Sequence, residues 1–190
     1  MDVLTREEFV EREFHYLREI DLGKLFIYPT DTIYGLGCDA TNARAVAQLQ
    51  ATKKRTQKPF SVIAPNKQWI HENCVVPPHA VEWLEKLPGP YTFVFKLKST
   101  DCVVPSVLCG GDTLGVRLPS HWFSERLKHF EKPIVTTSVN PSGEMFMTSL
   151  EHLHDSIKNR VSFIVYEGER IGKPSTIVRL DLKDAEVIER

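Results

Sequence analysis

Residues 24–40 read KLFIYPTDTIYGLGCDA, and this stretch decides the fold of the chain. Its first part, from Lys24 to Pro29, is an apolar run that predicts a buried strand. The second part, TDTIYGLGCDA, is dense in turn-forming residues and predicts a loop. A helix is expected to begin at about Asn42. A strand that leads through a polar loop into a helix is the first unit of an α/β layered fold.

The remaining sequence continues this alternation of strands and helices. Thr5 and Glu8 have the spacing of a capping box, which predicts an N-terminal helix that ends at Gly23. Further helices are expected as two short pieces within 66–87 and as single helices at 120–130 and 148–159. Further strands are expected in the apolar runs FSVIA (60–64), YTFVFKL (91–97), GVRLP (115–119), PIVTTSV (133–139), SFIVYE (162–167), STIVRLD (175–181) and AEVIE (185–189).

The spacing of these elements limits the topology. The strands after residue 160 follow one another with little room for helical crossovers, so part of the sheet should be antiparallel. No internal repeat, low-complexity tract or linker interrupts the sequence. We therefore expect residues 1–190 to form a single α/β domain.

Composition and charge argue against some classes of function. Lys and Arg number 24 against 25 Asp and Glu, which gives a net charge of −1. A protein that holds nucleic acid by charge alone is expected to be more basic, so any contact with RNA must use a local patch. The N-terminal run MDVLTREEFVEREF lacks the apolar stretch of a signal peptide, and no window approaches the ~20 apolar residues of a membrane helix.

The cysteines give no sign of a metal centre or of a disulfide framework. Cys38, Cys74, Cys102 and Cys109 are scattered and form no CxxC pair, and the sequence contains no HExxH motif. This pattern fits a reducing cytosol. We expect a cytoplasmic protein with no membrane segment and no metal held by protein ligands.

Polar side chains gather where the first buried strand ends, in the run Tyr28-Pro-Thr-Asp-Thr-Ile-Tyr-Gly-Leu-Gly. Ligands of α/β sheets bind beyond the carboxyl ends of strands, so these hydroxyls and this carboxylate suit a site for a polar small molecule. The alternative is a turn that its own side chains stabilise, since Thr, Asp and Gly are turn residues.

A basic cluster of Lys53, Lys54 and Arg55, with Lys58 close behind, ends the helix that begins near Asn42. Such cations either interact favourably with the helix dipole or clamp a polyphosphate, for which Arg offers a planar fork and Lys a compact charge. Residues 53 and 55 do not share a face of a regular helix, so a site that uses both requires the helix to end there.

A third polar group lies at the end of the strand expected at 133–139. Ser138 and Asn140 alternate with Val139, so their side chains share one face of an extended segment. They can present a hydroxyl and an amide together to a phosphate or a ribose. The run Asn-Pro-Ser-Gly that begins at Asn140 is also a common loop signal, which is the alternative.

The run Gly168-Glu-Arg-Ile-Gly-Lys-Pro-Ser-Thr has the look of a P-loop but does not fit the motif. Its glycine spacing is one residue short of GxxxxGK[ST], and Pro174 and a strand follow where a helix should begin. Ser175 and Thr176 can still line a site as hydroxyls that enter a strand. No GxSxG or GxGxxG motif is present, so a hydrolase triad and a Rossmann site are unsupported.

Taken together, six segments resemble the YrdC/Sua5 family in their order and spacing, over roughly residues 24 to 181. They are PTDTIYGLGCDA (29–40), the KKR cluster leading into KPFSVI (53–63), PGPYTFVF (88–95), GVRLPSH (115–121), TTSVNPSG (136–143) and KPSTIVRLD (173–181). The resemblance implies a twisted, mixed α/β sheet with flanking helices around a concave, electropositive cavity. The chain is similar to the short, single-domain form of the family, so we expect it to lack the extra C-terminal domain of longer members.

The resemblance also implies an activity. Members of the family are nucleotidyltransferases that condense L-threonine, bicarbonate and ATP into threonylcarbamoyl-AMP and release pyrophosphate. A partner transferase then moves the threonylcarbamoyl group to an adenosine of tRNA, so tRNA contact by this chain would be indirect or weak. Mg²⁺ is expected as a bridge between the phosphates of ATP, without a dedicated protein cage.

Carried over residue by residue, the family pattern implies a set of site residues. Lys53 and Arg55 are the expected catalytic cations, shared between the triphosphate and the threonine carboxylate. The expected threonine-binding residues are Thr30, Thr32, Tyr34, Arg55, Arg117 and Ser175. The expected ATP-binding residues are Lys53, Arg55, Ser138, Asn140, Ser175 and Thr176.

Two alternatives stay open at the level of sequence. YrdC-like domains also form carbamoyl-adenylate from carbamoyl phosphate and ATP, inside longer chains with zinc-finger and acylphosphatase regions. A non-catalytic module that binds structured RNA is the other alternative. The balanced charge argues against it, and a strongly salt-dependent affinity for RNA would argue for it.

Overall fold

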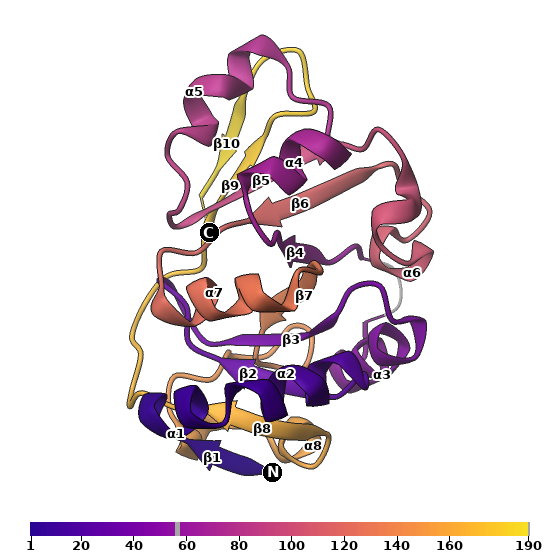
Figure 1. The fold of residues 1–190 in the computed structure, drawn as a ribbon. Coiled ribbons are helices and arrows are strands. Elements are labelled where there is room, and N and C mark those ends of the chain that lie inside the picture. Colours follow the sequence, from indigo (N-terminus) through magenta and orange to yellow (C-terminus); the bar gives the residue numbers. More distant parts are fainter. Residues whose placement is uncertain (56–57, 190) are drawn as a thin grey trace.

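The apolar runs of the sequence pair side by side in one mixed sheet. The computed structural model describes residues 1–55 and 58–189, and ten strands within these ranges form the sheet in the order β1-β8-β2-β3-β7-β4-β6-β5-β9-β10 (Figure 1). The strands are β1 (Asp2–Leu4), β2 (Leu25–Tyr28), β3 (Gly35–Asp39), β4 (Ser61–Ile63), β5 (Tyr91–Lys96), β6 (Thr113–Arg117), β7 (Ile134–Ser138), β8 (Val161–Val165), β9 (Thr176–Arg179) and β10 (Glu186–Ile188).

Short helices connect these strands. The α-helices are α1 (Arg6–Glu11), α2 (Glu13–Asp21), α3 (Ala43–Lys53), α4 (Lys67–Asn73), α5 (Val81–Leu84), α6 (Pro105–Leu108), α7 (Trp122–Leu127) and α8 (Asp155–Lys158). The 3-10 turns are η1 (Pro78–Ala80), η2 (Thr100–Cys102), η3 (Lys128–Phe130) and η4 (Leu150–His152). In the part of the chain that the structure describes, none of these helices has the length and apolar character to span a bilayer.

Most of the predicted elements are confirmed, including the mixed character of the sheet. The pairs β1–β8, β2–β8, β4–β6 and β5–β9 are parallel, and the other pairs are antiparallel. The capping box is present, because the Thr5 hydroxyl accepts from the Glu8 backbone N–H and the Glu8 carboxylate accepts from that of Thr5. Gly23 has φ of +83°, as expected for a residue that ends a helix.

Two predictions at the level of elements were wrong, and one strand was not predicted. The glycine-rich end of the run TDTIYGLGCDA is strand β3, which pairs with β2 on one side and β7 on the other. Residues 2–4 form β1, whose pairing with β8 lies far away in sequence. The helix expected at 148–159 is reduced to η4 and α8, because Leu153 and His154 between them are extended.

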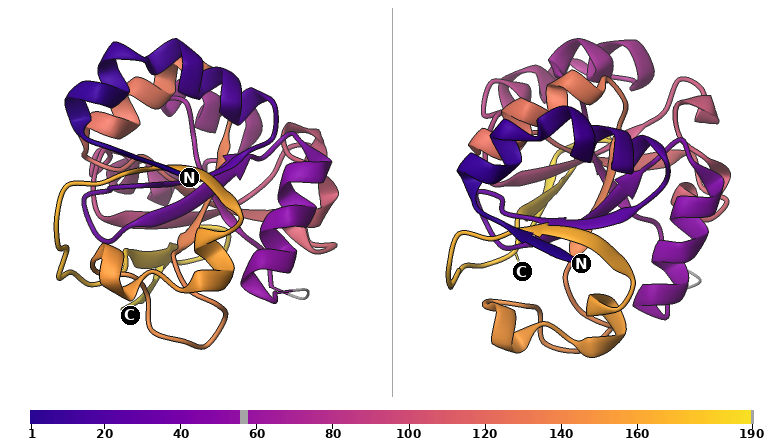
Figure 2. Two further views of the ribbon diagram at one scale, coloured as in Figure 1. Left: turned by 90° about the horizontal axis from the view of Figure 1, so that it is seen from below. Right: turned by 60° about the horizontal axis from the view of Figure 1, so that its bottom comes forward.

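Two apolar clusters hold the layers together. The helices α1, α2 and α7 lie together over one face of the sheet, and α8 lies on the opposite side (Figure 2). The first cluster is aromatic, with Phe9, Tyr16 and Phe123 from these helices packed on Phe26 and Phe163 of the strands. The second is larger and includes residues of α3, α4 and α8 together with residues of β2, β8 and several other strands.

A long connection spans the sheet near its C-terminal end. Strand β8 is second from one edge and β9 is second from the other, so residues 166–175 must cross between them. We call residues 166–175 the strap; it runs along the left-hand side of Figure 1. It passes over the loop that follows β2, which brings two polar runs of the sequence together.

Candidate active site

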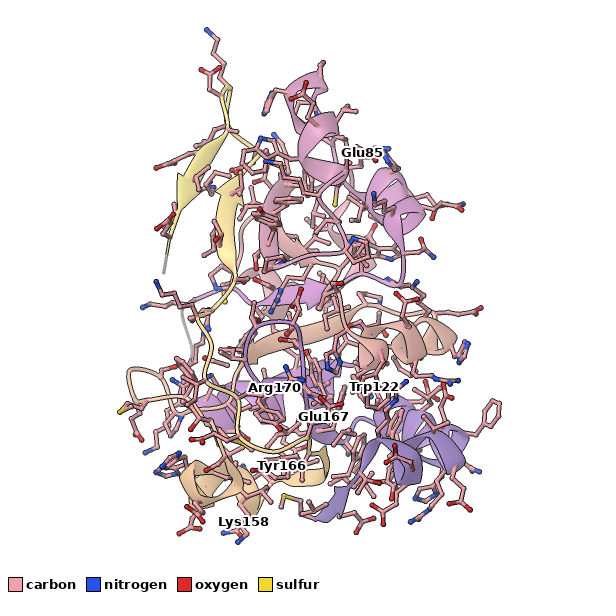
Figure 3. The ribbon with its side chains drawn as sticks, turned by 90° about the vertical axis from the view of Figure 1, so that its left-hand side faces the viewer. Glu85, Trp122, Lys158, Tyr166, Glu167 and Arg170 are labelled. Atoms are coloured by element: carbon pink, nitrogen blue, oxygen red, sulfur yellow. The ribbon has the colours of Figure 1, made fainter. Side chains whose placement is uncertain are left out.

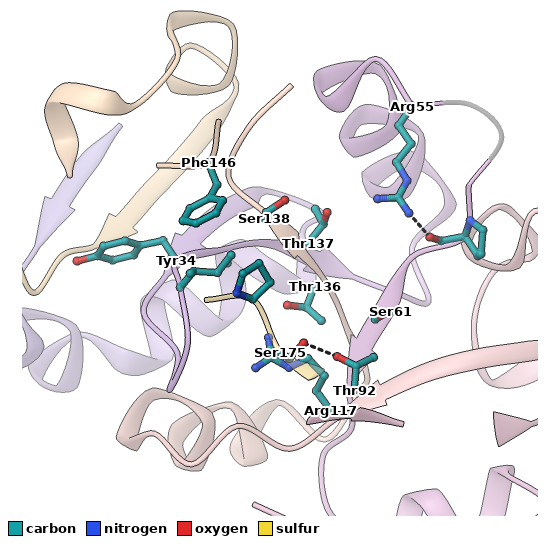
Figure 4. A pocket seen from close by; sticks show the side chains of 14 residues that line it. Tyr34, Arg55, Ser61, Thr92, Arg117, Thr136, Thr137, Ser138, Phe146 and Ser175 are labelled. Carbon is teal, nitrogen blue, oxygen red and sulfur yellow. Dashed lines mark hydrogen bonds between the residues drawn. The ribbon is translucent and has the colours of Figure 1, made fainter. Parts of the chain in front are cut away.

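A polar cavity of about 130 Å³ lies over the middle strands of the sheet (Figure 4). A second hollow of about 290 Å³ shares Arg55 and Ser138 with it, so the two are neighbours. The cavity is lined by Ile33, Tyr34, Gly35, Arg55, Pro59, Ser61, Thr92, Arg117, Thr136, Thr137, Ser138, Phe146, Pro174 and Ser175. The second hollow is lined by Lys53, Lys54, Arg55, Lys58, Ser138, Asn140, Ser142 and Gly143.

Arg117 brings a buried positive charge to the end of β6. It is 7% exposed, and its Nη2 donates to Asp31 Oδ1 and to Thr32 Oγ1, both at 3.1 Å. Its Nε has no hydrogen-bond partner among the described residues. Burial lowers the pKa of Arg117 and the Asp31 carboxylate opposes this shift, but a guanidinium stays charged. A buried guanidinium with an unpaired hydrogen-bond donor favours an anionic ligand such as a carboxylate.

The loop after β2 is built by its own side chains and by Arg117. The Thr30 hydroxyl donates to the Ile33 carbonyl at 2.7 Å and accepts from the Thr32 N–H at 3.1 Å. Asp31 accepts from the Ser120 N–H at 2.9 Å in addition to its bond from Arg117. Neither Thr30 nor Thr32 lines the cavity. Thr32 therefore accepts from the guanidinium that lines the cavity, and Thr30 shapes the loop that presents Thr32.

Tyr34 forms one wall of the cavity and is tied to the strap. Its hydroxyl donates to the Gly168 carbonyl at 2.7 Å and accepts from the Glu167 N–H at 3.0 Å. Burial raises the pKa of the Tyr34 hydroxyl. Because the hydroxyl is used in these two bonds, Tyr34 offers its ring, and not its oxygen, to a ligand.

Lys53 ends α3 and enters the second hollow with only 2% of the residue exposed. Its Nζ donates to the Ser138 carbonyl at 2.6 Å and to Asn140 Oδ1 at 2.8 Å. Burial, assisted by the nearby Arg55 charge, lowers the pKa of Lys53 to about 7. The pKa of this amino group thus lies near neutral pH, which is unusual for lysine.

Arg55 lies where the two hollows meet. The helix ends at Lys53, and Lys54 adopts the left-handed conformation with φ of +50°, so the chain turns sharply before Arg55. The condition set by the sequence, that the helix must end for residues 53 and 55 to share a site, is met. The Arg55 guanidinium stacks over the Phe60 ring at 4.7 Å and donates to the Lys58 and Pro59 carbonyls. Burial lowers its pKa.

Ser138 and Asn140 lie on one face, as the alternation predicts. The Ser138 hydroxyl donates to Asn140 Oδ1 at 2.6 Å, and Asn140 Nδ2 donates to the Glu144 carbonyl at 2.6 Å. Asn140 therefore ties Lys53, Ser138 and the following turn to one another. Ser138 lines both hollows.

Ser175 closes the cavity from the end of the strap, whereas Thr176 does not reach it. The Ser175 and Thr92 hydroxyls lie 2.6 Å apart, and Ser175 is 2% exposed. Thr176 is the first residue of β9, and its N–H donates to the Pro90 carbonyl at 3.1 Å. It does not line the cavity, although the family pattern implies an ATP-binding role for it.

Several lining residues escaped the reasoning from sequence. Ser61, Thr92 and Thr136 are hydroxyl residues that adjoin apolar residues of β4, β5 and β7. A hydroxyl beside the apolar residues of a strand is the signal that could have found them. Phe146 and Pro174 carry no such signal, because their approach to the cavity depends on how distant loops fold over the sheet.

The cavity contains cations and hydroxyls but no cluster of metal ligands. Among the residues that the structure describes, no three His, Cys, Asp or Glu side chains lie close enough together to hold a metal ion. Fold and site together define an α/β protein whose sheet carries a cationic, hydroxyl-lined cavity suited to a small anionic ligand.

Comparison with known proteins gives the family. The Sua5/YciO/YrdC family model, described as "Telomere recombination", matches residues 18–190. The threonylcarbamoyl-AMP synthase of Pyrococcus abyssi is 34% identical over 87% of this chain and 48% of that protein. A Methanocaldococcus jannaschii protein, assigned the same activity provisionally, is 31% identical over 92% of this chain and 84% of its own length.

A solved structure shares the fold. The crystal structure of P. abyssi Sua5 complexed with L-threonine has 27% sequence identity and a TM-score of 0.86, over 98% of this chain and 56% of that one. This chain thus spans about half the length of the P. abyssi relatives. The chain belongs to the Sua5/YciO/YrdC family.

Proposed function

We propose that this chain condenses L-threonine, bicarbonate and ATP into L-threonylcarbamoyl-adenylate, with release of pyrophosphate. The observation that carries the proposal is the buried guanidinium of Arg117, which lines the cavity with its Nε unpaired among the described residues, beside a hollow lined by Lys53 and Arg55. The first charge suits a carboxylate and the second pair suits a triphosphate. The P. abyssi relatives, named a threonylcarbamoyl-AMP synthase and solved with L-threonine, support the same assignment.

The chemistry requires charge stabilisation and no protein nucleophile. The threonine amine and bicarbonate give a carbamate and water, and a carbamate oxygen then attacks the α-phosphate. The bond from the α-phosphorus to the bridging oxygen breaks as pyrophosphate leaves. Lys53 and Arg55 would stabilise the charge that develops on the phosphate oxygens, and Arg117 would hold the amino acid. Much of the rate would come from positioning three substrates in adjoining hollows.

ATP would enter as its Mg²⁺ complex. The metal would bridge phosphate oxygens, and Ser138 and Asn140 would help to hold the phosphate or ribose side. The product is a reactive mixed anhydride, so a second, transferase enzyme must consume it. A cytoplasmic location and indirect contact with tRNA complete the proposal.

Pyrophosphate release from ATP, Mg²⁺ and bicarbonate tests the function, measured with and without L-threonine. We expect threonine-dependent release that Arg55→Ala reduces by about 100-fold or more, because a cation that faces the transferred group is lost. Arg44→Ala is the matched control, since Arg44 is exposed on α3, the helix that precedes Arg55.

Two results would count against the proposal. Release that does not depend on threonine, but that responds to carbamoyl phosphate, would assign the chain to carbamoyl-adenylate formation. No release under any condition, with an RNA affinity that falls steeply with salt, would favour an RNA-binding module.

A further inference from the structure

The strap carries a cluster of charged and aromatic groups that the proposed chemistry does not use. Arg170 and Glu167 of the strap lie beside Trp122 of α7 (Figure 3). The Glu167 carboxylate accepts from Trp122 Nε1 and from Arg170 Nη2, and its Oε2 lies 3.2 Å from His121 Nε2. The cluster therefore joins the strap to the segment that follows Arg117.

The charge states within this cluster are set by its hydrogen bonds. His121 Nδ1 accepts from the Phe123 N–H at 3.2 Å, and His121 Nε2 lies 3.2 Å from Glu167 Oε2 and 3.0 Å from Arg170 Nη2. Burial lowers the pKa of His121, although the nearby Glu167 carboxylate opposes this shift. Burial acts to raise the pKa of Glu167, but the bonds from Trp122 and Arg170 outweigh it and the pKa is lowered. Glu167 and Arg170 thus form the ion pair at the centre.

The second terminal nitrogen of the Arg170 guanidinium reaches the loop that follows β2. Arg170 Nη1 donates to the Thr30 carbonyl at 2.6 Å. The strap also touches this loop through its backbone, because a Cβ on Gly172 would lie 2.4 Å from the Thr32 carbonyl oxygen. Arg170 does not line the cavity. Its contact with the site is therefore indirect, through the Thr30 carbonyl.

The position of the Thr30 carbonyl affects Arg117, because the next two residues of the loop contact the Arg117 guanidinium. Asp31 and Thr32 accept the hydrogen bonds that orient the Arg117 guanidinium, and Asp31 is fixed on its other oxygen by the Ser120 N–H. A shift of the loop by an ångström would turn the guanidinium out of line, and misplacement on that scale costs on the order of 100-fold in rate.

We propose that Arg170, clamped by Glu167, is a positioning residue that holds the Thr30–Thr32 loop and so sets the Arg117 guanidinium for the carboxylate of the amino-acid substrate. The inference rests on the proposed function and adds a residue to it. It concerns binding of the amino acid and not of ATP, because Lys53 and Arg55 reach the second hollow from α3 without passing through the strap.

A purely structural role for Arg170 would give a different result from a positioning role. The Arg170 side chain is 24% exposed, and ion pairs of this kind contribute little to stability. The strap keeps other attachments when the side chain is lost, including the Arg170 N–H bond to the Thr148 carbonyl and the Tyr34 bond to Gly168. Loss of the guanidinium should therefore loosen the loop and leave the fold intact.

The test is the steady-state kinetics of Arg170→Ala, with L-threonine binding measured by calorimetry. We expect the KM and the Kd for L-threonine to rise about tenfold or more and the KM for ATP to change less than about twofold. Added guanidinium ion, but not urea, should restore threonine affinity by filling the vacated position. Arg126→Ala is the matched control, because Arg126 pairs with Glu13 at 3.3 Å on other elements.

Each outcome decides between the alternatives. Unchanged threonine parameters, equal changes for threonine and ATP, or no response to guanidinium would overturn the role of Arg170. Wild-type protein that binds threonine without releasing pyrophosphate would overturn the proposed function alone, and the calorimetry would still test Arg170. Wild-type protein that neither binds threonine nor turns over would overturn both.

Discussion

At the scale of the residue, the buried, charged amino group of Lys53 should lower the free energy of unfolding by a measurable amount. Burial lowers its pKa to about 7 from 10.5. Between these values the unfolded chain keeps the proton that the folded chain releases, so stability should rise with pH over this window and be level below it. Relative to Lys53→Met, the free energy of unfolding of the wild type should gain on the order of 2 kcal/mol from pH 7 to pH 9, by urea titration.

The neighbouring Lys54 provides the control, because it is exposed. Lys54→Met should follow the wild type in its dependence on pH. If the difference between wild type and Lys53→Met stays flat from pH 7 to pH 9, the amino group is not the buried, proton-releasing group described above.

The sequence predicts which residues belong to the site better than it predicts which residues each of them contacts. The polar runs at strand ends pointed to Thr32 and Ser138, because loops beyond strand ends collect functional side chains. The basic cluster that ends a helix pointed to Lys53, and the family resemblance implied Arg117. Which of them touch a ligand and which hold another residue depends on contacts across the sheet. Thr32 lies behind Arg117, for example, and nothing local to Thr32 marks that arrangement.

At the scale of the element, strand β3 explains the main error of the sequence prediction. Glycine is weak in strands, so Gly35 and Gly37 suggested a loop. In the structure the Tyr28 ring of β2 covers both glycines, with the positions of their absent Cβ atoms 2.7 and 2.9 Å from its atoms. The aromatic ring replaces the missing side chains, which is a cross-strand effect that local propensity does not contain.

Gly37→Ala should therefore destabilise the sheet. The new methyl group would lie 2.9 Å from the Tyr28 ring and 2.9 Å from the Val135 carbonyl oxygen. The ring cannot move freely, because the Tyr28 hydroxyl donates to the buried Thr136 hydroxyl at 2.7 Å. We expect a loss of about 1–3 kcal/mol, seen as a lower urea midpoint at an unchanged m-value.

Gly111→Ala is the comparison, since a Cβ there meets its nearest neighbour, the Leu108 carbonyl oxygen, at 3.4 Å on an exposed turn. Its effect should stay within about 0.5 kcal/mol. Equal losses in the two variants would mean that the cost comes from the backbone of glycine and not from the Tyr28 ring.

At the scale of the whole molecule, the cavity is assembled from distant parts of the chain. Its lining comes from β3, β4, β5, β6 and β7, from the strap, and from the segments that precede β3, follow α3 and follow β7. The long-range order of the strands brings these parts together, and periodicity in the sequence predicts the strands but not their order. The same fact means that a ligand in the cavity bridges segments that separate only when the sheet unfolds.

Ligand binding should therefore raise the midpoint of global unfolding. L-threonine at about 100 times its dissociation constant should stabilise the protein by about 2.7 kcal/mol, which corresponds to roughly 5–10 °C for a domain of this size. Thermal denaturation with and without L-threonine measures the shift. Arg117→Lys keeps a cation beside Asp31 but loses the planar fork, so at the same threonine concentration its shift should be much smaller.

The stereochemistry of the ligand gives the sharpest form of this prediction. A guanidinium held in place by Asp31 and Thr32 fixes the carboxylate, so the remaining groups of the amino acid must point in directions that the cavity walls determine. D-threonine presents the same carboxylate with its amino group and side chain exchanged, and it should shift the midpoint far less than L-threonine. Equal shifts for wild type and Arg117→Lys would mean that the carboxylate is held elsewhere. Equal shifts for the two enantiomers would mean that the cavity accepts the anion but does not select the amino acid.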